Sequence, residues 1–119
     1  MNYISTRNNQ MNFSSEQVLN YGLAPDGGLF IPSELPKFSL EDLNKLKNAE
    51  YKDIAYFVLN PFLKDLFSEK EIKQLISDAY QSFDEGIVSI TELGENQLLN
   101  LFHGPTLAFK DYAMCLLAK

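Results

Sequence analysis

The stretch Leu101–Asp111 reads LFHGPTLAFKD, and it points to chemistry more directly than any other part of this chain. Its Lys110 follows apolar residues, precedes an aspartate and opens an apolar segment. A lysine that is removed from water has an amine that is neutral part of the time and can attack a carbonyl carbon. The same pattern fits a lysine whose stem packs on a core helix while its charge stays in water. This stretch alone leaves both interpretations open.

Length and composition indicate about one globular domain. The 119 residues are 45% hydrophobic and 13% aromatic, which is enough to form a core. The formal net charge of −6 argues against nucleic acid and against an anionic membrane surface as partners, because both attract basic faces. No apolar run approaches the roughly 18 residues that are needed to cross a bilayer.

The chain has one cysteine and one histidine, which limits its metal and redox chemistry. Cys115 has no partner for a disulfide within the chain, so we expect a reducing, cytoplasmic location and a buried packing role for this thiol. Cys115 and His103 cannot supply a metal site with standard ligand spacing, and we expect none. The segment Met1–Ser5 lacks the basic and then apolar pattern of a signal peptide.

Residues 1–84 are predicted to form a helix-rich α/β domain with short strands. Strands are expected at 3–6 and 29–31, and helices are expected to begin at Ser14 or Ser15, at Ser39 and at Ser68, each of which can cap a helix. Ser68 and Glu71 form the clearest capping box. Pro61 should kink or end the helix expected over 50–64. We attribute Gly27 and Gly28 to the geometry of a turn rather than to ligand contact.

Residues 85–119 are predicted to begin a second domain, because the helical periodicity stops near Gly86. The ranges 87–93 and 97–102 should pair as a hairpin through Gly94-Glu95. A helix is then expected from just after Pro105 to the C-terminus. Because this helix is apolar on nearly every side, it is typical of the interior of a larger protein, and we expect the chain to be truncated.

Three stretches in order along the chain together resemble threonine synthase. His103–Asp111 resembles the pyridoxal-phosphate lysine motif of that family, Gly22–Pro32 (GLAPDGGLFIP) resembles its second signature, and Tyr3–Arg7 resembles its opening strand. The combination spans almost the whole chain. One departure is Asn8, where the family often has glycine, and it affects only the local turn.

The resemblance implies a fold-type II pyridoxal 5'-phosphate enzyme. Such an enzyme, a carbon–oxygen lyase acting on phosphates, converts O-phospho-L-homoserine and water into L-threonine and phosphate in threonine biosynthesis. By the same resemblance, Lys110 holds the cofactor and then moves protons on the substrate, and residues 85–119 are the first hairpin and lysine-bearing helix of the cofactor domain. The family's Gly-rich phosphate loop does not occur in these residues, so we expect the fragment to need the remainder of its own chain and to be inactive alone.

The neighbours of Lys110 receive roles by the same resemblance and by simple geometry. Phe109 either walls the cofactor pocket or packs in the core. Thr106 either caps the helix or touches a ligand, and we favour the cap. Asp111 is assigned an orienting or structural role, because adjacent helical positions diverge by about 100° and it cannot point with Lys110. His103 can serve as a general base, but we favour a loop histidine bonded to nearby backbone.

Two alternatives to threonine synthase remain open. One is a threonine-synthase-like phospho-lyase, which would use the same lysine to eliminate phosphate toward a keto acid. The other belongs to a different class, namely a non-catalytic packing or dimerisation module in which Lys110 has no chemical task. Nothing in the sequence indicates the oligomeric state.

Overall fold

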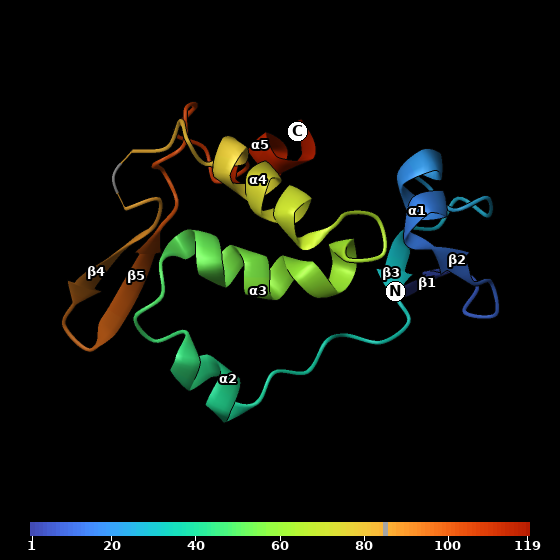
Figure 1. Ribbon diagram of the computed structural model, residues 1–119, viewed down its shortest axis with the longest axis horizontal. Coiled ribbons are helices and arrows are strands. Elements are labelled where there is room, and N and C mark those ends of the chain that lie inside the picture. Colours follow the sequence, from blue (N-terminus) through green and yellow to red (C-terminus); the bar gives the residue numbers. More distant parts are fainter. Residues whose placement is uncertain (85) are drawn as a thin grey trace.

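The computed structural model describes residues 1–84 and 86–119, and it has a mixed α/β architecture (Figure 1). In chain order the elements are β1 (Asn2–Ser5), β2 (Phe13–Ser14), α1 (Ser15–Tyr21), β3 (Phe30–Pro32), α2 (Leu40–Lys45), α3 (Tyr51–Leu63), α4 (Glu69–Ala79), β4 (Ser89–Leu93), β5 (Asn96–Asn100) and α5 (Asp111–Leu117). The mixed class is the predicted one. The predicted boundary between residues 84 and 85 adjoins residue 85, which lies outside the described residues.

A small antiparallel sheet forms the N-terminal end of the molecule. Its strand order is β2-β1-β3, and Tyr3 on the central strand pairs with Phe13 on one side and Pro32 on the other. Ser14 caps α1 as predicted, since its side chain accepts a hydrogen bond from the backbone N–H of Gln17. The buried Phe13 packs edge-on against Phe30, with ring centroids 4.9 Å apart. Phe13 also lies edge-on to Tyr21 of α1 at 6.3 Å, so helix α1 packs on the strands of this sheet.

The turn before β3 is held by a carboxylate. The Ser5 hydroxyl donates to Asp26 Oδ1 at 2.7 Å, and the Gly28 N–H donates to the same oxygen at 2.9 Å. These two bonds, the Ser5 bond foremost, hold the pKa of Asp26 below its usual value of 3.8. Gly27 has a φ of 76°, and a Cβ on Gly28 would overlap the Ser5 hydroxyl. Turn geometry thus explains both glycines, as predicted.

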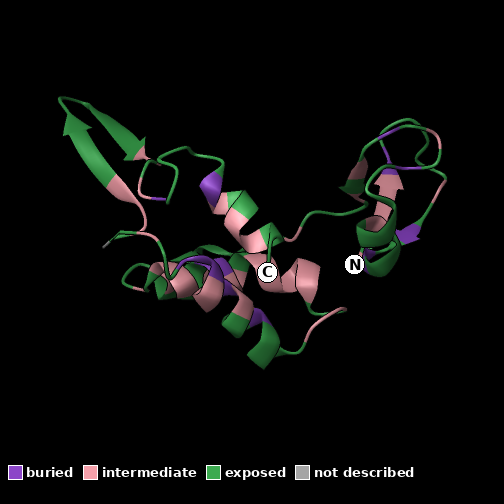
Figure 2. Ribbon diagram, turned by 90° about the horizontal axis from the view of Figure 1, so that it is seen from above, coloured by how far each residue is buried: buried purple, intermediate pink, exposed green. Residues whose placement is uncertain are grey.

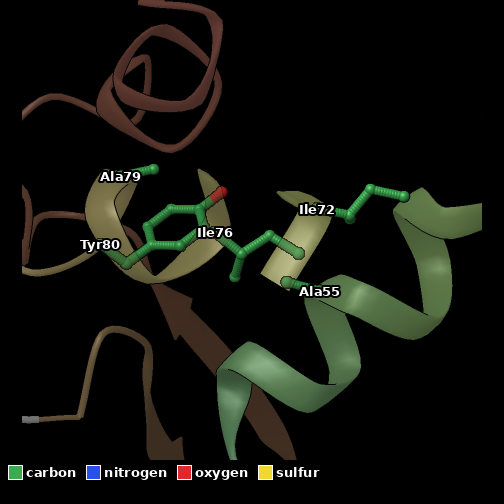
Figure 3. Close-up of a cluster of buried hydrophobic side chains, with 5 residues drawn as sticks. All are labelled: Ala55, Ile72, Ile76, Ala79 and Tyr80. Carbon is green, nitrogen blue, oxygen red and sulfur yellow. The ribbon is translucent and has the colours of Figure 1, made fainter. Parts of the chain in front are cut away.

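The main hydrophobic core lies between α3 and α4. Ile72 and Ile76 of α4 are almost fully buried, and they pack with Ala55 of α3 (Figure 3). The predicted capping box starts α4, because Ser68 accepts from the Glu71 N–H while the Glu71 carboxylate accepts from the Ser68 N–H at 2.8 Å. Figure 2 shows buried positions recurring along α4, whereas α2 has no buried residue.

Helix α3 fills the range 50–64 that was predicted for it, and it continues through Pro61, so of the two predicted effects of this proline, a kink or an end near Asn60, the second is wrong. Pro61 lies in the last turn, where a missing N–H removes one hydrogen bond at most. Leu63 packs against the core beyond it, and the Lys64 N–H still donates to the Asn60 carbonyl at 2.9 Å. Packing of the last turn therefore outweighs the local preference of proline.

Helix α5 is attached to the core through tyrosines. The Tyr80 hydroxyl, at the end of α4, donates to the Tyr112 carbonyl at 2.8 Å. The Tyr112 hydroxyl in turn donates to the Ile87 carbonyl, just before β4. Burial raises the pKa of both phenols, so both hydroxyls keep their protons and remain donors at neutral pH. Tyr112 thus links α4, α5 and the hairpin.

The molecule is more open than a compact domain of its size. Its radius of gyration is 16.5 Å, against about 13.5 Å for a compact chain of this length. Its accessible surface is 8713 Å², against about 6,600 Å² expected from its mass.

An apolar groove of about 750 Å³ runs along α3, α4 and α5. Within the described ranges, no helix has the length and apolar character to cross a membrane.

Candidate functional site

The segment 103–111, here called the lysine loop, connects the hairpin to α5. Helix α5 begins only at Asp111, so the prediction that the helix starts just after Pro105 is wrong. The loop turns twice instead, with the Leu107 N–H donating to the Gly104 carbonyl at 3.0 Å and the Asp111 N–H donating to Ala108 at 3.0 Å. Leu107 has a φ of 62°, which breaks any helix there.

Asp111 is the residue that fixes the shape of the lysine loop. Its side chain is buried, and its carboxylate accepts from the Thr106 N–H at 2.8 Å and from the Thr106 hydroxyl at 2.6 Å. Gly104 lies against the same side chain, because a Cβ there would stand 2.5 Å from Asp111 Cβ. Two hydrogen bonds from Thr106 and the close contact with Gly104 therefore hold the loop around the Asp111 side chain.

Thr106 does not cap the final helix, so the favoured prediction for it is wrong. The capping position is Lys110, and no side chain accepts a hydrogen bond there. Thr106 lies five residues before Asp111 and donates to it, whereas a cap accepts hydrogen bonds from the first turn. The physical reason is that the Asp111 carboxylate is a stronger acceptor than the threonine hydroxyl and recruits it as a donor.

Lys110 and Phe109 both face outward from the loop. Lys110 is exposed, and 67% of Phe109 is exposed, as is 68% of Leu107. Phe109 therefore does not pack in the core that the structure describes. Three neighbouring side chains, one primary amine and two apolar groups, are thus presented on a loop whose backbone is internally bonded. The loop thus presents a primary amine beside apolar surface.

His103 joins the lysine loop to the hairpin. Its Nε2 lies 2.8 Å from the Ser89 hydroxyl of β4, and its carbonyl accepts from the Asp84 N–H at 3.1 Å. His103 is thus a loop histidine with a backbone hydrogen bond, as favoured from the sequence, and its imidazole Nε2 is in addition engaged by a side-chain hydroxyl fourteen residues earlier. The Phe102 ring stacks on the imidazole at 4.8 Å.

Ser89 and Asn100 were not singled out from the sequence. They are partners in the β4–β5 ladder, and the Asn100 amide donates to the Ser89 hydroxyl at 3.1 Å. Their contact can nevertheless be predicted from the sequence. Both residues are polar, and in the predicted hairpin they occupy paired positions next to its open end. The burial of Asp111 had no such signal, since it depends on the turns of the loop.

The fold and sequence match known proteins over the whole chain. Residues 2–80 match the family described as "Threonine synthase N terminus". A threonine synthase of Pseudomonas aeruginosa is 39% identical over 121 residues, which cover 100% of this chain and 26% of that protein. The crystal structure of a threonine synthase from Brucella melitensis with bound pyridoxal phosphate has a TM-score of 0.93 at 38% identity, and the match covers 99% of this chain and 26% of that one.

A second solved structure, the threonine synthase from yeast, has a TM-score of 0.85 at 30% identity over 97% of this chain and 25% of its own. The mixed α/β fold described above is therefore the fold of the N-terminal region in these proteins. The chain belongs to the threonine synthase family. It spans about a quarter of the length of the relatives that it matches.

Proposed function

We propose that this chain is the N-terminal part of a pyridoxal-phosphate-dependent threonine synthase, which converts O-phospho-L-homoserine and water into L-threonine and phosphate. The observation that carries the proposal is the likeness to the pyridoxal-phosphate-bound Brucella enzyme over 99% of the chain, which includes the lysine loop. Residues 1–84 then form the N-terminal domain, and residues 85–119 form the first hairpin and the lysine-bearing helix of the cofactor domain.

Lys110 is the residue that would hold the cofactor and move protons on the substrate carbons. The bound cofactor would act as an electron sink for carbanions at those carbons. The exposed amine of Lys110 can reach a ligand outside the loop, and the exposed Phe109 ring can wall one side of it. Asp111 and Thr106 hold the loop through their two hydrogen bonds and so orient Lys110.

Reductive trapping tests this assignment. The complete protein that contains these residues is incubated with pyridoxal phosphate and borohydride, and its peptides are mapped by mass spectrometry. We expect the label on Lys110 and none on that peptide in Lys110→Ala. A Lys110→Arg variant keeps the charge and should likewise be unlabelled, because its guanidinium does not condense with the aldehyde. Label on another lysine would overturn the assignment.

Product analysis tests the reaction. The complete protein supplied with O-phospho-L-homoserine should release L-threonine and phosphate, and Lys110→Ala should release neither. Formation of 2-oxobutyrate would instead identify a phospho-lyase. A protein that neither binds the cofactor nor consumes the substrate would be the packing or dimerisation module. The 119 residues alone should be inactive.

A further inference from the structure

Strand β4 and the lysine loop are joined by a side-chain network that the proposed reaction does not yet use. The Ser89 hydroxyl lies 2.8 Å from His103 Nε2, and it accepts a hydrogen bond from the Asn100 amide at 3.1 Å. A serine oxygen has two lone pairs and one proton, so the Asn100 bond leaves the hydroxyl proton and one lone pair for the imidazole. Asn100 therefore orients Ser89 toward His103.

The lysine loop is held at both ends. At its start, His103 is fixed by Ser89. At its end, Asp111 is clamped by Thr106, and the next residue, Tyr112, donates its hydroxyl to the Ile87 carbonyl. Both attachments lead to the same short piece of chain, since Ile87 and Ser89 are two residues apart. Lys110 lies between the attachments, and Gly104, which follows His103, lies close against Asp111, since a Cβ there would stand 2.5 Å from Asp111 Cβ.

We propose that His103 and Ser89 are positioning residues for Lys110, which fix the lysine loop on strand β4 so that the amine stands where the cofactor and substrate need it. This inference rests on the proposed function. It gives His103 a role other than that of a general base, because the imidazole Nε2 is engaged by the Ser89 hydroxyl. Misplacing a reacting group by about 1 Å costs up to about 100-fold in rate, so a bond of this kind has a measurable effect.

The test uses the complete protein and five variants, one of which combines Ser89→Ala with His103→Ala. Ser89→Ala and His103→Ala each remove the bond, and His103→Gln keeps a polar nitrogen near the position of Nε2. Ser77→Ala is the matched control, because Ser77 is also half-buried and bonds to a side chain, Lys52 Nζ at 3.2 Å, but lies on α4 away from the loop.

Three readouts separate positioning from a purely structural role. We expect Ser89→Ala and His103→Ala to lower kcat by about 10- to 100-fold with KM changed by less than about twofold. The double variant should be no worse than either single variant, and His103→Gln should restore most of the loss. In the cofactor-free protein, amide exchange at Thr106 and Leu107 should be faster in both alanine variants and unchanged in Ser77→Ala.

Two other results would overturn the inference. If Ser89→Ala keeps the wild-type kcat while His103→Gln loses it, His103 acts as a base and not as a positioning residue. If both alanine variants keep the wild-type kcat and loop exchange, the bond only stabilises the fold. The proposed function is tested first and separately on the wild type: absence of label on Lys110 and of threonine refutes that function, whereas a wild type that passes leaves the variants to decide the inference.

Discussion

Gly104 shows how a single residue can set the geometry of a loop. A methyl group there would stand 2.5 Å from both Cβ and Oδ2 of Asp111, so one of the two residues has to move. The carboxylate that would move is the one that holds Thr106. The conformation of the lysine loop therefore depends on the absence of a side chain at position 104.

The first prediction concerns Gly104→Ala. We expect it to lower the free energy of unfolding by about 1–3 kcal/mol through overpacking, and to speed amide exchange at Thr106. Gly94→Ala is the control, since its φ of 62° costs about 1–2 kcal/mol in the hairpin turn but a Cβ meets nothing within 4 Å. Urea unfolding and hydrogen exchange measure both effects. Unchanged exchange at Thr106 in Gly104→Ala would contradict the prediction.

The second prediction concerns the left-handed backbone at Leu107. Asparagine adopts positive φ more readily than leucine, whereas a β-branched residue adopts it least. Because 68% of Leu107 is exposed, replacing its side chain loses little packing in this chain. Leu107→Asn should therefore be as stable as the wild type or more so, and Leu107→Val should be about 1 kcal/mol less stable. Equal unfolding midpoints for the two variants would show that φ at this position is relaxed.

Residue-scale patterns in the sequence predicted the helix caps but not the lysine loop. Ser14, Ser39 and Ser68 cap their helices as expected, because a cap is decided within four residues. Local preference predicts too early a start for α5, because the Thr106 hydroxyl donates to the side chain of Asp111 and so does not cap the helix. Which hydrogen bond forms there depends on the folded loop and not on local preference.

At the scale of elements, the stability that the capping box gives to helix α4 depends on pH. The Ser68 hydroxyl and N–H both donate to the Glu71 carboxylate and hold its pKa below the usual value of 4.5, the hydroxyl having the larger effect. A carboxyl group with a lower pKa in the folded state than in the unfolded state stabilises the fold above the unfolded value. That contribution is lost as the pH falls from about 4.5 through the folded value.

The third prediction follows from this capping box. Ser68→Ala should lower the free energy of unfolding by about 1 kcal/mol at pH 7, because the cap is lost. Glu71→Gln should flatten the dependence of stability on pH below 4.5, where the wild type loses stability. Urea midpoints at pH 7 and pH 3 compare the three proteins. The same slope in the wild type and Glu71→Gln would place the acid sensitivity elsewhere.

Long, periodic elements were predictable from sequence and short ones less so. Helix α4 has its apolar residues at helical spacing, and the structure buries Ile72 and Ile76 as that spacing implies. The range of helix α3 is also predictable, but whether Pro61 ends it is not, because the packing of Leu63 carries the helix past the proline. The hairpin register followed from the Gly94 turn, whereas its attachment to His103 is a contact between segments far apart in sequence.

At the scale of the whole molecule, the open shape leaves apolar surface uncovered. Side chains from α3, α4 and α5 line the groove, and 71% of Leu117 at its edge is exposed. Apolar surface of this kind favours association, because burying it against a partner removes it from water. The 119 residues studied by themselves should therefore associate through this face.

The fourth prediction is a concentration-dependent association of the isolated chain. Leu117→Lys places a charge in the groove and removes about 1.5–3 kcal/mol of apolar burial, so it should weaken association about tenfold or more. Leu40→Lys is the control, because 79% of Leu40 is exposed but it lies on α2, outside the groove. Light scattering over a range of concentrations measures both. A chain that stays monomeric throughout would show that the groove does not self-associate.

The pairing of α3 with α4 has a consequence for the order of events during synthesis. These helices are adjacent in sequence, and the core that they share needs nothing from the hairpin to begin forming. Lys110 leaves the ribosome roughly 30 residues after α4, a delay of about 2–6 seconds at usual translation rates, whereas helices form within microseconds. The surface on which α5 packs can therefore begin to form before the lysine emerges from the ribosome. A nascent chain stalled so that Ala79 has just left the ribosome should already protect Ile76, and Lys110 then emerges next to a core that has begun to form.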